Sequence, residues 1–361
     1  MKSKNICCVF LAMSLISVGC TEKTTAETDG TETNDIANIS PRSITFEWQP
    51  LYEQKLNEYM TTEKFSDKAQ NGTGESRFDL YDLNADGTPE LLISANDSHT
   101  TMCEIFTVSG GAVTSVGELG EYGTFDFYPD FNLINSEYSG DGFVVGKFIS
   151  FNGSELVDSF SYSDNSASAS KGAEMKYEID GEELSRPEYD EAMAVYKNAH
   201  TVSIGRKYSF GASTMDYALH CSESWGAVLT PKEKELFRGQ LMQNFTMSLE
   251  TGKNSAFELC DLNNDEIPEL VVSEGTDNND SCRIYYITNN VLLELDGAFG
   301  YQGRLHFDNE QLVFYMTGSP TGNACWSLTE NDISSFSVSM SNMECGRKYT
   351  LNENTINASL R

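Results

Sequence analysis

Short runs in which apolar and polar residues alternate recur along this chain, and turn-forming residues separate them. In the first half they cover 103–108, 112–117, 143–151 and 156–162, with turn pairs at Gly110-Gly111 and Asn152-Gly153. Alternation with a period of two is typical of strands with one buried face, and such turns join antiparallel neighbours. Helical spacing of apolar residues is found near 47–61, 187–198 and 231–248. The pattern therefore predicts an α+β protein built on antiparallel meanders.

The same pattern recurs 179 residues later. The segment Cys103-Glu104-Ile105-Phe106 aligns with Cys282-Arg283-Ile284-Tyr285, and the runs 283–288 and 291–295 repeat the first two strands. The tetrapeptide GRKY at 205–208 recurs at 346–349, 141 residues later, so the first copy carries an insertion of 38 residues within about 164–204. Self-similarity on this scale indicates duplication of a whole domain. We predict two homologous tandem domains, 44–229 and 230–361, each an antiparallel meander with a packed N-terminal helix.

One loop motif occurs in both copies, as DLNADGTPE at 82–90 and DLNNDEIPE at 261–269. Oxygen side chains at positions 1, 3, 5 and 9, with a backbone carbonyl at position 7, make a donor set that Ca²⁺ prefers. The predicted ligands are Asp82, Asn84, Asp86, Glu90 and the Thr88 carbonyl, and in the second loop Asp261, Asn263, Asp265, Glu269 and the Ile267 carbonyl. The competing interpretation is a hairpin turn that Asp, Asn and Gly favour without any metal.

The context of the motif excludes an EF-hand, which would need flanking helices and a Glu at position 12, where Ile93 and Val272 stand. The loops resemble the strand-linking calcium loops of FG-GAP and integrin-type repeats. They are also similar to DLNxDGxPEL segments of secreted lipoproteins from gut Firmicutes. The resemblance implies one Ca²⁺ per repeat and gives a propeller-like arrangement of β blades as the structural alternative.

The two loops differ at position 6, which is Gly87 in the first and Glu266 in the second. If the loops share one geometry, this residue makes a sharp turn in which a Cβ is costly. The Glu266 side chain is expected to point outward, where solvent screens its charge. Backbone strain should then make the second site the weaker one.

The N-terminus has the features of a bacterial lipoprotein leader. Lys2 and Lys4 precede an apolar run that is too short to span a membrane, and the run ends at Ser17-Val18-Gly19-Cys20, which resembles a lipobox. We predict a signal peptide over 1–19, lipidation of Cys20, and a disordered acidic, Thr-rich tether over 20–43. An ordinary signal peptide cut near Gly19 is the alternative. The expected location is the extracellular face of the cell membrane.

Charge and cysteine content narrow the classes of partner. Without Lys2 and Lys4 the mature chain has 22 basic and 55 acidic residues, a formal charge of −33. Nucleic acid would be repelled, and contact with the membrane is expected only through the N-terminal lipid. Six cysteines remain after Cys20, with fifteen possible disulfide pairings and no C-x-x-C pair. Mostly reduced cysteines are expected, because the resemblance suggests an anaerobic host.

No sequence signature of an active site is found. The four histidines have no metal-binding spacing, and neither a nucleophile elbow nor a phosphate-binding loop occurs. Trp48 and Trp326 are expected in the core rather than on a sugar-binding surface. The sequence favours a non-catalytic cell-surface lipoprotein that serves as a binding, adhesion or accessory module for an extracellular glycan or protein. An exported glycan- or peptide-degrading hydrolase with an unrecognisable site is the alternative.

Overall fold

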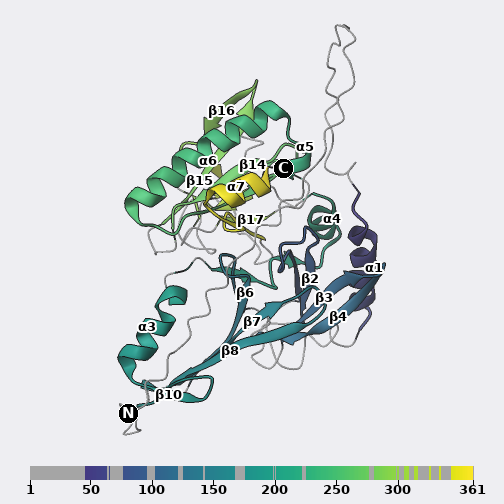
Figure 1. Cartoon of the computed structure of the whole chain (residues 1–361). Coiled ribbons are helices and arrows are strands. Elements are labelled where there is room, and N and C mark those ends of the chain that lie inside the picture. The colour runs from purple at the N-terminus through teal and green to yellow at the C-terminus, as the bar shows by residue number, and fades with distance from the viewer. Residues whose placement is uncertain are drawn as a thin grey trace, which may run out of the picture. The chain divides into compact units, whose positions relative to one another are not determined.

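We describe the protein from a computed structural model (Figure 1). The described residues are 45–62, 65, 76–95, 102–120, 125–140, 143–166, 175–197, 199, 201–221, 225–275, 280–297, 299–300, 305–308, 313–315, 325–326, 333–334 and 343–360. The predicted signal peptide, Cys20 and the predicted tether lie outside them. No helix in the described part of the chain is both long and apolar enough to span a membrane.

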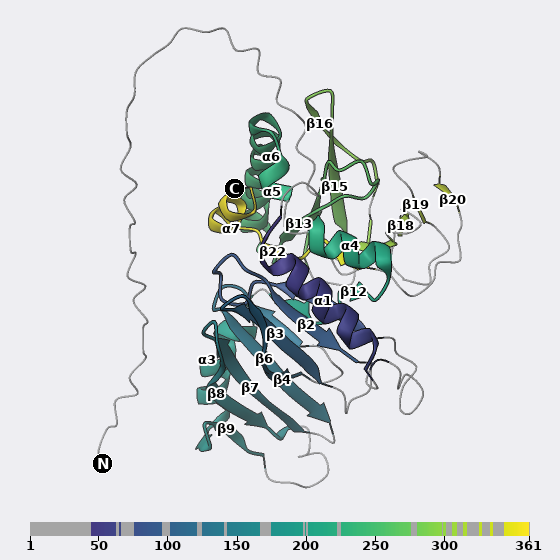
Figure 2. The same cartoon turned by 90° about the vertical axis from the view of Figure 1, so that its right-hand side faces the viewer.

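The first half begins with helix α1 (Trp48–Met60) and a five-stranded antiparallel sheet of order β12-β1-β2-β3-β4. Its strands are β1 (Arg77–Tyr81), β2 (Glu90–Ser94), β3 (Cys103–Ser109), β4 (Ala112–Leu119) and β12 (Tyr208–Ser209). All five residues of β2 are buried, as expected for a central strand, whereas most residues of β4 at the edge are exposed or half-buried. Figure 2 shows α1 running alongside this sheet, and the helix contacts β4.

A second sheet of seven strands follows, with order β10-β9-β8-β7-β6-β5-β11. Its strands are β5 (Phe125–Tyr128), β6 (Leu133–Gly140), β7 (Phe143–Phe151), β8 (Leu156–Asp164), β9 (Tyr177–Ile179), β10 (Glu182–Leu184) and β11 (Val202–Ile204). The predicted insertion supplies β9, β10 and helix α3 (Arg186–Lys197), so it extends one edge of this sheet. Rings from the helix and the sheet pack together, as where Tyr196 lies 4.5 Å from Phe148 between centroids.

The second half has helices α5 (Trp225–Val228), α6 (Pro231–Thr251) and α7 (Glu353–Ser359) and two further antiparallel sheets. The first of these sheets has the order β16-β15-β14-β13-β22. Its strands are β13 (Ala256–Cys260), β14 (Glu269–Ser273), β15 (Cys282–Thr288), β16 (Val291–Glu294) and β22 (Tyr349–Thr350). The second sheet has the order β20-β19-β18-β17-β21. Its strands are β17 (Leu305–Asp308), β18 (Val313–Tyr315), β19 (Cys325–Trp326), β20 (Ile333–Ser334) and β21 (Met343–Cys345).

The strand orders of the two halves correspond at the offsets found in the sequence. Sheet β12-β1-β2-β3-β4 matches β22-β13-β14-β15-β16, and without the insertion β8-β7-β6-β5-β11 matches β20-β19-β18-β17-β21. Helix α4 (Ala212–His220) takes the place in the first half that α7 takes in the second. The mixed α and β composition and the antiparallel pairing were predicted correctly. The prediction of one sheet per half was wrong, because β5–β11 and β17–β21 form second sheets, and only β12 and β22 return to the first sheets. The described sheets have five or seven strands, unlike four-stranded propeller blades.

Both halves contribute to one continuous hydrophobic core. It includes Trp48 and Tyr52 from α1, Phe237 and Leu241 from α6, and Leu360 at the end of the described chain. Trp48 is 4% exposed, which confirms its predicted place in the core. Thr230 caps the start of α6 in a complete capping box, with both reciprocal hydrogen bonds to Glu233 formed.

An ion pair that is largely withdrawn from solvent also joins the halves. The ammonium of Lys207, which precedes β12, contacts the carboxylate of Glu258 on β13, and their side chains are 14% and 6% exposed. The backbone N–H of Gly346 donates a 2.9 Å hydrogen bond to the other oxygen of Glu258. In the first half the matching acid, Asp79, accepts the same bond from Gly205 at 3.0 Å.

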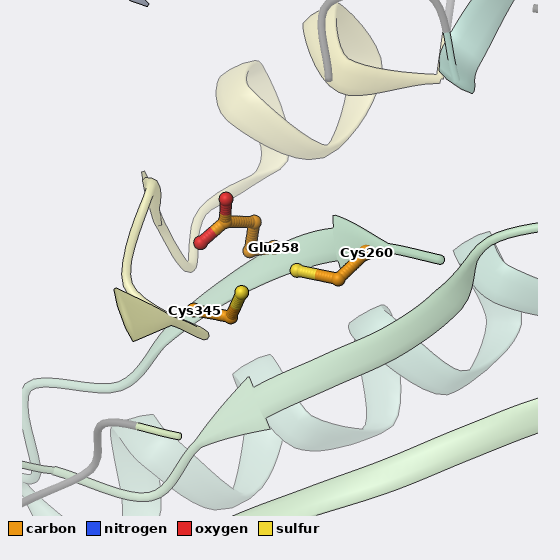
Figure 3. Close-up of side chains that lie close together, drawn as sticks. All are labelled: Glu258, Cys260 and Cys345. Carbon is orange, nitrogen blue, oxygen red and sulfur yellow. The ribbon is translucent and has the colours of Figure 1, made fainter. Parts of the chain in front are cut away.

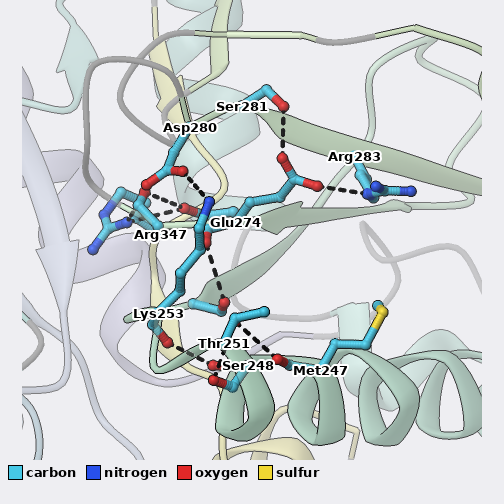
Figure 4. Close-up of polar contacts among 12 residues, drawn as sticks. Met247, Ser248, Thr251, Lys253, Glu274, Asp280, Ser281, Arg283 and Arg347 are labelled. Atoms are coloured by element: carbon cyan, nitrogen blue, oxygen red, sulfur yellow. Dashed lines mark hydrogen bonds and ion pairs between the residues drawn. The ribbon is translucent and has the colours of Figure 1, made fainter.

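A polar network supports the start of the second half's sheet (Figure 4). Buried Arg347 donates to the Ser273 hydroxyl and to the Gly275 carbonyl, both at 2.9 Å. The Lys253 ammonium pairs with the carboxylate of Asp280, whose side chain is 5% exposed. These bonds fix both ends of the connection between β14 and β15.

Candidate metal-binding loops

Each predicted loop joins two antiparallel strands, as the sequence indicated. In the first half Tyr81 at the end of β1 pairs with Glu90 at the start of β2, and residues 82–89 connect them. In the second half Cys260 pairs with Glu269 in the same register, and 261–268 connect them. The buried leucine at the second loop position, Leu83 or Leu262, anchors each loop in the core.

Hydrogen bonds bring the side chains of the first loop together. The Asp82 carboxylate accepts from the N–H groups of Asp86 and Gly87, at 3.1 and 2.8 Å. The Asn84 side-chain oxygen accepts from Asp86 at 3.1 Å, and Asp86 accepts from the Thr88 N–H at 2.8 Å. The alternate side chains are therefore oriented inward by backbone donors.

The second loop repeats these contacts bond for bond. The Asp261 carboxylate accepts from Asp265 and Glu266, at 3.2 and 3.0 Å. The Asp265 carboxylate accepts from Ile267 at 2.8 Å, and Asn263 accepts from Asp265 at 3.0 Å. The two loops thus have one geometry.

The sixth loop position has a positive φ in both loops, as the sequence argument required. Its φ is 91° at Gly87 and 66° at Glu266. A Cβ at Gly87 would meet no atom within 4 Å, so the cost of a side chain there is backbone strain alone. The Glu266 side chain is half-buried rather than fully exposed, so solvent screens its charge less than we expected.

A buried glutamate closes each loop from the start of the second strand. Glu90 is 1% exposed and accepts a 2.9 Å bond from the Leu83 N–H and a 3.1 Å bond from the Thr107 hydroxyl. Burial raises the pKa of Glu90 to about 8, and the negative charges of Asp82 and Asp86 add to the rise. Burial likewise raises the pKa of Glu269 well above its usual value, with Asp261 and Asp265 adding to it.

This arrangement fits a hard cation. Buried carboxylates that face two further carboxylates repel one another, and a bound cation would offset that repulsion. The carboxylate oxygens of Asp82, Asp86 and Glu90 do not all lie within 4.8 Å of one another. Calcium holds its oxygen donors at 2.3–2.6 Å, so donors on opposite sides of the ion are about 5 Å apart. Binding of Ca²⁺ therefore requires the three carboxylates to lie within about that separation of one another.

Two supporting residues of the first loop were missed in the sequence. The Thr107 hydroxyl orients Glu90 from β3, and the Tyr52 hydroxyl on α1 donates a 2.8 Å bond to the Pro89 carbonyl. A threonine in a strand and a tyrosine in a helix carry no distinctive signal, so only the fold identifies these roles. The matched residues of the second half are Tyr286, whose hydroxyl is phenolic, and Phe237, which has no hydroxyl.

A cavity of about 340 Å³ lies between α1 and α4, away from both loops. Met60, Phe210, Met215 and Leu219 contribute apolar lining, and Glu53 and Asp216 contribute carboxylates. His220, at the end of α4, is half-buried in this lining. Trp48 and Trp225 are 4% and 2% exposed, so neither offers a face for stacking on a sugar ring. The side chain of Trp326 lies outside the described residues.

No family model, curated protein or solved structure matches this chain. Interpretation of the two loops therefore depends on their own chemistry.

Proposed function

We propose that this protein is a non-catalytic, lipid-anchored cell-surface protein whose two homologous domains are each stabilised by one Ca²⁺. The single observation that carries the proposal is that one hydrogen-bonded loop occurs twice, each time with a buried glutamate facing two aspartates. The proposed ligands are those expected from the sequence. In the first loop they are Asp82, Asn84, Asp86, Glu90 and the Thr88 carbonyl, and in the second Asp261, Asn263, Asp265, Glu269 and the Ile267 carbonyl. Bound Ca²⁺ would favour the ionised form of these carboxyl groups and offset the repulsion between them.

The corresponding strand orders support the homology of the two domains. So do the matched contacts of Gly205 with Asp79 and of Gly346 with Glu258. The ring pairs Phe78–Tyr208 and Phe257–Tyr349 have the same centroid separation of 5.3 Å. Duplication followed by insertion of β9, β10 and α3 accounts for these correspondences.

The proposed role is to bind an extracellular glycan or protein. The apolar cavity between α1 and α4 favours a protein ligand, because flexible methionine side chains adapt to an inserted apolar group. Incubation with labelled cell-wall and plant glycans, in parallel with candidate proteins, distinguishes a binder from an exported hydrolase. Retention without turnover supports the proposed role, and release of glycan or peptide products contradicts it.

Thermal melting of the mature chain tests calcium binding. A ligand that binds only the folded state at 100 times its dissociation constant stabilises that state by about 2.7 kcal/mol per site. We expect the midpoint to be higher in excess Ca²⁺ than in a chelator. The double variant Asp86→Asn/Asp265→Asn keeps an oxygen that can accept the loop N–H but removes one charge per loop, so it should lose most of this shift.

The matched control is Glu182→Gln/Glu191→Gln, which removes the same charge from two exposed positions outside the loops. It should retain the full calcium shift. Identical curves for the unsubstituted protein with and without Ca²⁺ would mean that the loops are hairpin turns of the metal-free kind.

A further inference from the structure

Two thiols of the second half face each other in the protein interior. Cys260 ends β13 and Cys345 ends β21, and both side chains are buried. Their sulfur atoms lie within 4.8 Å of each other and of an oxygen of Glu258. In Figure 3 the two sulfurs point toward each other, one from β13 and the other from β21.

The contacts of Glu258 argue against a metal ion at this cluster. One carboxylate oxygen is paired with the Lys207 ammonium, and the other accepts the Gly346 N–H. The lysine charge near the thiols opposes a divalent cation. Two thiols remain, which is fewer than the four ligands of a structural zinc site.

We infer that Cys260 and Cys345 form a disulfide when the chain folds in an oxidising compartment. The two thiols lose two protons and two electrons as the S–S bond forms. The electrons reduce the S–S bond of a small-molecule or protein disulfide, which leaves as two thiols. The inference rests on the proposed function only for its cellular setting, which is export.

Exchange must take place before the strands close over the sulfurs. Burial raises the pKa of the Cys260 thiol well above its usual value, so the reactive thiolate is scarce in the folded protein. Thiol–disulfide exchange is therefore a step of folding rather than a switch in the folded state. Once formed, the bond is shielded from reductants.

The bond would connect the two sheets of the second half, since β13 and β21 belong to different sheets. The positions matched in the first half are Tyr81 and Ile204, which pack in the same hydrophobic cluster. The matched positions thus belong to one cluster in the first half, and the second half has cysteine at both. Cysteine at only one of these two positions could not form such a bond.

Disulfide mapping of the mature chain tests the inference. The protein is unfolded, refolded with reduced and oxidised glutathione, alkylated under denaturing conditions and digested for mass spectrometry. We expect a linked peptide that contains Cys260 and Cys345 and two fewer alkylated cysteines than in the reduced protein. Full alkylation of both residues, or a link from Cys282 to Cys345 instead, would overturn the inference.

Melting adds a second readout. Oxidised protein should melt several degrees above reduced protein, and Cys260→Ala or Cys345→Ala should abolish that difference. Cys103→Ala, a buried cysteine in the first half, should preserve it. If zinc protects both thiols from alkylation and no linked peptide forms, the cluster is a metal site and the inference fails. A linked peptide without any calcium shift would retain the inference and reject the calcium proposal.

Discussion

Replacing Lys207 with methionine tests the buried ion pair that joins the two halves. The substitution keeps most of the side-chain volume but removes the charge opposite Glu258, which is 5% exposed as a residue. That carboxylate would keep only the Gly346 N–H. Removal of one partner from a buried pair usually costs about 3–5 kcal/mol, because a buried charge is left uncompensated. We expect a loss of this size from the free energy of unfolding.

The reciprocal substitution Glu258→Gln should cost less. Lys207 also acts on Asp79, whose charge would still compensate the ammonium. In the double variant Lys207→Met/Glu258→Gln both charges are gone, so much of the loss should be recovered. The two single variants and the double variant form a thermodynamic cycle that isolates the pair.

Urea denaturation of the mature chain measures these changes through the midpoint at constant slope. The matched control is Lys147→Met, because Lys147 and Asp158 form an ion pair with side chains 41% and 66% exposed. Exposed pairs contribute about 0–1 kcal/mol. A Lys207→Met loss no larger than that of Lys147→Met, or a double variant as unstable as the single one, would refute the reasoning.

Three further predictions concern other parts of the chain. Burial raises the pKa of Asp79 to about 6, so the unfolded chain loses this proton first as pH rises. The protonated Asp79 carboxyl contributes its full stability below about pH 4, and about 3 kcal/mol of the free energy of unfolding is lost as the pH rises toward 6. Asp79→Asn should remove this pH dependence from the free energy of unfolding, measured by denaturation at several pH values in this range. An unchanged pH dependence would contradict the prediction. Calcium titration of the full chain should show Gly87→Ala weakening the first site and Glu266→Gly strengthening the second, each several-fold if about 1 kcal/mol of strain is borne on binding. Opposite changes would mean that the half-buried Glu266 charge dominates. Cys20→Ser should release the protein from the membrane fraction in detergent partitioning, and unchanged retention would exclude lipidation at this residue.

Local features were predictable because the chain determines them over short distances. The strands at 103–109 and 143–151, the glycine turn at 110–111 and the cap at Thr230 all agree with the sequence pattern. The positive φ at Glu266 also followed from position alone. Alternation and turn chemistry act between neighbouring residues, so one sequence suffices to detect them.

Features set by distant pairing were not predictable. The GRKY repeat was visible, but the sequence could not show that Lys207 pairs with Glu258, 51 residues later and in the other half. The split of each half into two sheets depends on which strand edges meet, which the alternation of residues leaves open. Likewise, Cys260–Cys345 was one of fifteen possible pairs among six cysteines until β13 and β21 placed the two residues together.

The continuous core has a consequence for how the chain is made. Because Trp48, Phe237 and Leu360 belong to one cluster, the core is incomplete until the last helix has been synthesised. Residues of the shared cluster therefore reach their full burial only once both halves have been synthesised. The same dependence means that a nonsense mutation that removes α7 would also expose residues of the shared core that this helix covers. Helix α7, the last described helix, thus completes the shared core.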